Sequence, residues 1–189
     1  MDHRRYRSFI GLVVAWCAVL CGFGDPLYSA SAGTADPFAA LHITRMTSAA
    51  SITAFNLKGL DGETLSSQDL AGKAVLMNFW ATWCGPCKEE IPSLARLQTQ
   101  FDPLKVRIVT VTTDVYPQGI RQFLDHMGVR LPVLFDEDQE LSRAFMVRGL
   151  PTTVVISPQG QAVGRAVGPR PWDSQESIAL IRQVLEGTK

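Results

Sequence analysis

Between residues 80 and 87 the chain reads Trp80-Ala81-Thr82-Trp83-Cys84-Gly85-Pro86-Cys87, and its organisation can be worked out from this segment. The segment places two cysteines three positions apart, after an apolar run and at the start of a helix-like sequence. A cysteine at a helix N-terminus lies beside unpaired backbone N–H groups and the positive end of the helix dipole, and both stabilise a thiolate. Because positions i and i+3 are neighbours on a helix, Cys87 can close a disulfide with Cys84. The spacing therefore predicts a dithiol that switches between open and bonded forms.

Three further motifs surround this segment. Val75-Leu76-Met77-Asn78-Phe79 precedes it, Glu89-Glu90-Ile91-Pro92 follows it, and Gly149-Leu150-Pro151-Thr152-Thr153 lies far downstream. With these motifs, residues 52–186 resemble the TlpA/ResA-like branch of the thioredoxin superfamily, the membrane-tethered or secreted thiol-disulfide reductases. The resemblance implies a thioredoxin-like α/β fold, with a central mixed β-sheet flanked by helices and with N-terminal and central insertions.

The pattern of apolar residues agrees with an α/β fold. Ala74–Trp80 is a near-continuous apolar run, which is typical of a strand buried on both faces of a sheet. Asp173 and Ser174 can cap a final helix that ends at Gly187. The other expected strands cover residues 52–57, 106–113, 132–135, 152–156 and 161–167, and the other expected helices cover residues 87–101, 118–127 and 139–145. The resemblance assigns the insertions to residues 52–70 and 118–145.

The first 32 residues are interpreted as a signal peptide or an N-terminal membrane anchor. A basic start is followed by the apolar stretch Phe9–Leu20, and Ala30-Ser31-Ala32 fits a cleavage site before Gly33. The uncharged stretch from Ser8 to Gly24 is nearly long enough to span a membrane, so an uncleaved anchor stays open. Twin-arginine export and lipidation at Cys21 are weaker alternatives. Residues 33–50 are predicted to be a linker, and residues 51–189 the thioredoxin-like domain.

Charge and cysteine content narrow the class of function. The formal net charge is zero, which gives no attraction to nucleic acid or to an acidic membrane surface. Cys17 and Cys21 fall in the targeting segment, so the exported domain keeps only Cys84 and Cys87. A disulfide that closes a loop with two intervening residues removes little entropy from the unfolded chain. The pair is therefore interpreted as redox-active rather than as a structural bond.

Each residue of the cysteine motif receives an expected role. Cys84 is the attacking thiol, since it lies nearest the helix terminus, and Cys87, one turn into the helix, is the resolving thiol. Gly85 lets a partner backbone approach, and Pro86 presets helical geometry. Trp83 is expected at the rim of the site. No cofactor and no resident metal are expected, although two thiolates suit Cu(I).

The resemblance implies roles for residues outside the motif. An acidic residue at the position of Glu90 tunes the cysteine pair in these proteins, and Glu90 could take the Cys87 proton. The alternative for Glu90 is simple complementation of the helix dipole. Pro151 is expected to be cis and to present backbone to substrate, with Leu150 and Thr152 as flanking contacts. Asn78 stands where cytosolic thioredoxins carry a buried aspartate, and it cannot take up a charge.

Two other groups of residues are given structural interpretations. Trp80 is expected to pack in the core. The acidic group Asp136, Glu137, Asp138 and Glu140 is interpreted as a solvated turn and helix start without a functional role.

These observations predict an exported thiol-disulfide oxidoreductase, at the periplasmic or extracytoplasmic face, that works mainly as a reductant. The resemblance implies extracytoplasmic protein substrates with cysteine pairs, such as apocytochrome c or a copper-site assembly protein. It also implies a membrane electron donor of the DsbD/CcdA type. A net oxidant or isomerase, a Cu(I) delivery factor and a non-catalytic interaction module remain alternatives. A thiol peroxidase is disfavoured, because its usual Thr- and Pro-containing cysteine context is absent.

Overall fold

The computed structural model of this chain describes residues 35–46 and 52–187. The predicted signal peptide or anchor at residues 1–32, with Cys17 and Cys21, lies outside the described residues. The strands are β1 (Thr44–Arg45), β2 (Asn56–Lys58), β3 (Thr64–Ser66), β4 (Ala74–Trp80), β5 (Val106–Thr112), β6 (Val133–Phe135), β7 (Thr152–Ile156) and β8 (Ala162–Val167). The helices are α1 (Pro37–Ala40), the 3-10 helix η1 (Ser67–Leu70), α2 (Gly85–Gln98), α3 (Pro117–His126), α4 (Glu140–Ala144) and α5 (Gln175–Glu186).

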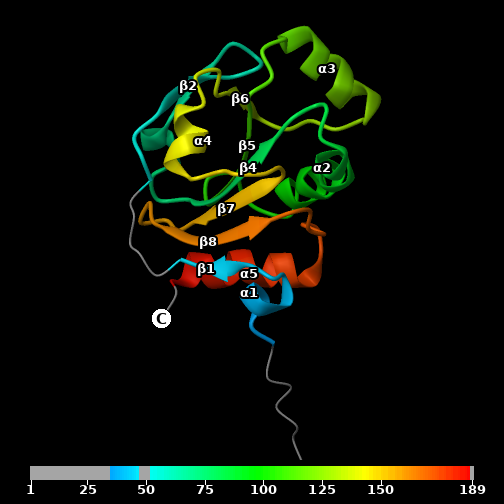
Figure 1. Ribbon diagram of the computed structural model, residues 1–189. Helices are drawn as coiled ribbons and strands as arrows, with labels where there is room; N and C mark the ends of the chain where they lie inside the picture. Colours follow the sequence, from blue (N-terminus) through cyan, green and yellow to red (C-terminus); the bar gives the residue numbers. More distant parts are fainter. Residues whose placement is uncertain (1–34, 47–51, 188–189) are drawn as a thin grey trace, which may run out of the picture. The chain divides into compact units, whose positions relative to one another are not determined.

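Six of the strands form one mixed sheet in the order β1-β8-β7-β4-β5-β6 (Figure 1). Strands β4, β5 and β6 run parallel, whereas β7, β8 and β1 join by antiparallel pairing. The parallel β4-α2-β5 connection needs a crossover, and α2 supplies it. The predicted thioredoxin-like α/β fold with a mixed sheet and flanking helices is therefore confirmed.

Strand β4 is buried on both faces along its whole length, as its apolar run predicts. Alternate side chains of a strand point to opposite faces. Leu76 and Trp80 pack against α2, while Met77 and Phe79 pack on the other face of the sheet. Asn78 has the same parity as Leu76 and Trp80, so it lies under α2.

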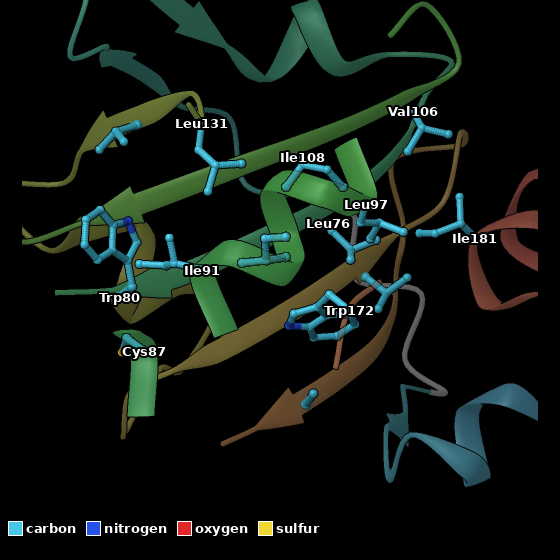
Figure 2. Close-up of a cluster of buried hydrophobic side chains, with 14 of the residues drawn as sticks. Leu76, Trp80, Cys87, Ile91, Leu97, Val106, Ile108, Leu131, Trp172 and Ile181 are labelled. Carbon is cyan, nitrogen blue, oxygen red and sulfur yellow. The ribbon is translucent and has the colours of Figure 1, made fainter. Parts of the chain in front are cut away.

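The two faces of the sheet carry separate apolar layers. Helices α1, α2, α3 and α5 contribute to the layer that contains Leu76 and Trp80, and Figure 2 shows Ile91 and Trp172 in this layer. The other layer is covered by α4, η1 and the small β2-β3 sheet. The predicted insertions correspond to β2, β3 and η1 before β4, and to α3, β6 and α4 between β5 and β7.

The linker prediction for residues 33–50 is wrong for residues 35–46, which we call the N-terminal arm. This arm forms α1 and the edge strand β1, which pairs with β8 through Thr44 and Arg45. Phe38, Leu41 and Ile43 are buried in the layer shared with α5. The arm escaped prediction because its elements are too short to show a period, and its partner strand lies about 120 residues further along the chain.

Candidate active site

The cysteine motif begins α2 at the carboxyl end of β4. Cys84 is the N-cap residue of α2, and its Sγ accepts a hydrogen bond from the backbone N–H of Cys87 at 3.2 Å. The two sulfurs form a disulfide, with the Cα atoms 5.3 Å apart. Cys84 retains 4% of its surface exposed, whereas Cys87 is fully buried. The local spacing therefore pairs the two cysteines as the sequence predicts, and only Cys84 can be reached from outside.

A groove of about 540 Å³ opens beside Cys84, and we call it the redox groove. Its lining residues are Trp83, Cys84, Gly85, Pro86, Thr113, Gln139, Ser142, Val147, Arg148, Gly149 and Leu150. Four of the predicted substrate contacts, Trp83, Gly85, Pro86 and Leu150, are thus brought together around one sulfur. Thr152 instead lines an adjoining groove of about 420 Å³, which we call the side groove. Both grooves share Arg148 and Gly149.

The loop before β7 faces the disulfide through Leu150. The Leu150–Pro151 peptide bond is cis, as the resemblance implies. The Pro151 carbonyl accepts a hydrogen bond from the Gly168 N–H at 2.8 Å, and the Thr152 hydroxyl donates to the Gly149 carbonyl at 2.7 Å. Among the described residues, the backbone N–H and C=O of Leu150 have no hydrogen-bond partner. The backbone available for strand pairing therefore belongs to Leu150, whereas the Pro151 carbonyl is already used within the sheet.

Glu90 lies one turn after Cys87 on α2 and is buried. Its Oε1 accepts a hydrogen bond from Asn78 Nδ2 at 2.6 Å. Its Oε2 accepts from Trp172 Nε1 at 3.0 Å and from the backbone N–H of Arg170 at 3.1 Å. Burial, only partly offset by these hydrogen bonds, raises the pKa of Glu90 to about 7. A carboxyl with such a pKa can both accept and release a proton at neutral pH.

A family model described as the AhpC/TSA family matches residues 49–163 of the chain. The chain belongs to this family. The chain is similar to the thiol-disulfide oxidoreductase ResA of Bacillus subtilis, with 38% identity over 60% of this chain and 64% of ResA. It is also similar to the thioredoxin-like protein YneN of the same organism, with 39% identity over 56% of this chain and 63% of YneN. The chain thus aligns with less than two thirds of the length of these relatives.

Solved structures give the same fold. A thiol:disulfide interchange protein of the thioredoxin family from Chlorobium tepidum superposes with a TM-score of 0.62 and 30% identity. The superposition covers 71% of this chain and 95% of that protein. The resemblance to ResA-like proteins that the motifs indicate is confirmed by these similarities.

Two of the residues that donate hydrogen bonds to Glu90 were not found from the sequence. Trp172 and Arg170 precede α5, about 80 positions after Glu90. The Arg170 side chain also donates to the carbonyls of Leu41, at 2.6 Å, and His42, at 3.2 Å. The one local signal was a tryptophan just before a helix cap. The loop around Arg170 therefore connects the Glu90 carboxylate with the N-terminal arm.

The two tryptophans of the motif lie where they were expected. Trp80 is buried and lies against Phe123 in a tilted arrangement, with 5.3 Å between the ring centroids, and its Nε1 has no hydrogen-bond partner among the described residues. Trp83 is 72% exposed, which places it on the rim of the redox groove.

The interpretation of the acidic group at residues 136–140 needs one correction. Asp136 is buried, and its carboxylate accepts hydrogen bonds from the backbone N–H groups of Leu141 and Ser142 and from the Ser142 hydroxyl. Asp136 therefore holds the start of α4, whereas Glu137, Asp138 and Glu140 are exposed. A second missed carboxylate is Asp114, whose Oδ2 accepts from the Thr82 N–H at 2.7 Å and fixes the turn before Cys84.

In the part of the chain that the structure describes, none of the helices is long and apolar enough to cross a membrane.

Proposed function

We propose that this protein is a thiol-disulfide oxidoreductase that reduces disulfides in other proteins through Cys84 and Cys87. The observation that carries the proposal is the disulfide at the N-terminus of α2, with one sulfur beside the redox groove and the other buried. ResA, the relative with 38% identity, is named for the same activity.

The first step is attack by Cys84 on a substrate disulfide. In the reduced protein, the N-terminus of α2 and the Cys87 N–H that faces Sγ of Cys84 stabilise a thiolate. This thiolate forms a bond with one substrate sulfur while the substrate S–S bond breaks. The second substrate sulfur leaves as a thiolate and takes up a proton. The substrate segment lies along the redox groove and pairs with the free backbone groups of Leu150.

The second step is attack by Cys87 on Cys84. Glu90 accepts the Cys87 proton, which its raised pKa allows at neutral pH. The Cys87 sulfur bonds to Sγ of Cys84, and the mixed disulfide breaks. The substrate sulfur leaves as a thiolate that is then protonated. Two electrons and two protons have passed to the substrate, and the protein holds the Cys84–Cys87 disulfide.

The direction of electron transfer and the cellular location are part of the same proposal. Gly85-Pro86 is the dipeptide of reducing thioredoxins, which favours a reductant. The signal peptide or anchor predicted at residues 1–32 favours the periplasmic or extracytoplasmic face. A membrane donor of the DsbD/CcdA type would restore the dithiol. Apocytochrome c and copper-site assembly proteins are the two substrate classes that the resemblance implies.

Thiol trapping in intact cells tests this function. Free thiols are alkylated in the parent, in a Cys87→Ala variant and in a Cys84→Ala control, and the remaining disulfides are then identified. We expect a mostly reduced parent, mixed disulfides that accumulate in Cys87→Ala, and none in Cys84→Ala. A parent that is mostly disulfide-bonded would favour the oxidant alternative. Stoichiometric Cu(I) retention without any disulfide exchange would favour copper delivery.

A further inference from the structure

Arg148 stands where the redox groove and the side groove meet. It lines both of them, together with Gly149. Of the described residues that line the redox groove, Arg148 alone is charged, and it shares the side groove with Arg165. No aspartate or glutamate of the described residues lines either groove. The surface that receives a substrate of Cys84 therefore carries positive charge alone.

This positive charge is not neutralised within the described part of the chain. The ion pairs found there join Arg45 to Asp36, Arg96 to Asp173 and Arg121 to Asp61. Within these same residues, Arg148 is exposed and has neither an ion-pair partner nor a side-chain hydrogen bond. Arg165 donates to the Phe145 carbonyl, and its buried Nε has no partner there. A guanidinium binds a carboxylate through two parallel hydrogen bonds, so Arg148 suits an acidic ligand group, with the charge of Arg165 nearby.

The rims of the two grooves are apolar. Trp83 is 72% exposed, Met146 is 56% exposed and Val167 is 61% exposed. Large apolar side chains gathered at a groove are typical of a surface that binds another chain. Apolar rims beside Arg148 and Arg165 fit a segment that combines apolar residues with a carboxylate.

The spacing along the loop indicates where that carboxylate would lie. Arg148 and Leu150 are two residues apart and both line the redox groove. A substrate segment that pairs with the free backbone of Leu150 places its cysteine opposite Leu150 or one residue away from that position. Paired strands advance in step along the chain. A side chain two or three residues from that cysteine would therefore reach Arg148.

We propose that Arg148 selects substrates, and that the preferred substrate is an extended protein segment with Asp or Glu two or three residues from the cysteine that Cys84 attacks. This inference rests on the proposed function. It adds a substrate class defined by charge, and Arg148 as a specificity residue that touches the substrate without taking part in the bond exchange.

Disulfide-containing peptides that differ at one position test the inference. Glu, Gln or Lys is placed two or three residues before or after the cysteine, and the rate of reduction by the reduced protein is measured. At low ionic strength we expect the best Glu peptide to react about fivefold faster than its Lys counterpart, with Gln between them. The ratio should fall toward one at high salt, because exposed charges are screened.

Two charge-reversal variants separate a local contact from the field of the whole protein. Arg148→Glu should reverse the order of the Glu and Lys peptides, so that the Lys peptide reacts faster than the Glu peptide. Arg182→Glu changes the net charge equally, but Arg182 is exposed on α5 and lines neither groove, so the parental order should persist.

Equal rates for Glu and Lys at every position would overturn the inference. So would a preference that survives in Arg148→Glu, or one lost to the same extent in Arg182→Glu. Failure of the proposed function looks different, since the reduced parent would then leave even the Gln peptides unreduced, and the inference would fall with it.

Discussion

The indole Nε1 of Trp172 donates a hydrogen bond to Oε2 of Glu90 at 3.0 Å, across 82 positions of sequence. Both side chains are buried, and Trp172 lies in the apolar layer beneath α2 (Figure 2). The contact stabilises the charged form of a carboxyl that burial drives toward the neutral form. The proton affinity of Glu90 is thus set by the segment before α5 as well as by α2 itself.

Replacing Glu90 with Gln should remove a pH dependence of stability. The pKa of Glu90 is raised to about 7 in the folded protein from 4.5. Between these values the folded state holds a proton that the unfolded chain has released, so the parent loses stability as pH rises. The loss is on the order of 3 kcal/mol, and it is complete above about pH 7. Urea unfolding from pH 4 to 8 measures this slope, which Glu90→Gln should lack.

The glutamine can keep a hydrogen bond to Asn78. Asn78 Oδ1 has no partner among the described residues, and a half-turn of the amide would present it to the new Gln N–H. Glu89→Gln is the matched control, because Glu89 is exposed on the same turn of α2. If Glu89→Gln removed the slope equally, or Glu90→Gln kept it, burial of Glu90 would not be its cause.

Trp172→Phe should shift the pH transition upward. The variant removes the indole N–H that faces Glu90, so the charged carboxylate loses one hydrogen bond and its pKa rises further. We expect the midpoint of the stability transition to move by about one pH unit. The pH dependence of the rate at which the mixed disulfide is resolved should shift by the same amount.

Trp80→Phe provides the comparison for Trp172→Phe. Trp80 is equally buried on the same face, but its Nε1 has no partner within the described residues. Both variants lose ring volume and should cost roughly 2 kcal/mol at acid pH. A midpoint that moves as far in Trp80→Phe as in Trp172→Phe would mean that packing, rather than the hydrogen bond, sets it.

Gly164→Ala should loosen the N-terminal arm. A Cβ at position 164 on β8 would lie 2.8 Å from both Ile43 Cγ2 and Phe38 Cε1, which is closer than carbon atoms approach. We expect a loss of about 1–3 kcal/mol and faster proteolysis within residues 35–46. Gly119→Ala in α3, where the nearest atom is 3.9 Å away, should be neutral or stabilising. If the N-terminal arm resisted proteolysis equally in both variants, its close packing against Gly164 would be contradicted.

Asp136→Asn should destabilise the start of α4. The carboxylate oxygens accept two backbone N–H groups and one hydroxyl, and an amide nitrogen cannot replace an oxygen there. Loss of a buried cap of this kind costs about 1–3 kcal/mol, measured by chemical denaturation. Asp138→Asn changes the same charge on an exposed side chain and should remain within about 0.5 kcal/mol of the parent. Similar losses in both variants would restore the interpretation of a solvated turn.

The strands and helices that sequence predicted well are those with a strong local signal. Strand β7 was placed at its observed residues, because a β-branched run follows Pro151 directly. Strand β4 was recognised from its unbroken apolar run. The first strand was expected at residues 52–57, whereas β2 covers Asn56–Lys58, because a three-residue strand in a separate sheet leaves little pattern.

The pairing of Cys84 with Cys87 could be predicted from local sequence alone, since a three-residue spacing at a helix start brings the sulfurs together. The burial of Glu90 and the identity of its hydrogen-bond donors depend instead on how distant segments pack together. Asn78 lies on another strand, and Arg170 and Trp172 follow about 80 residues later. The docking of the N-terminal arm and the burial of Asp136 likewise depend on that packing. Burial and long-range hydrogen bonds depend on where the chain returns in space, and local periodicity carries no record of that.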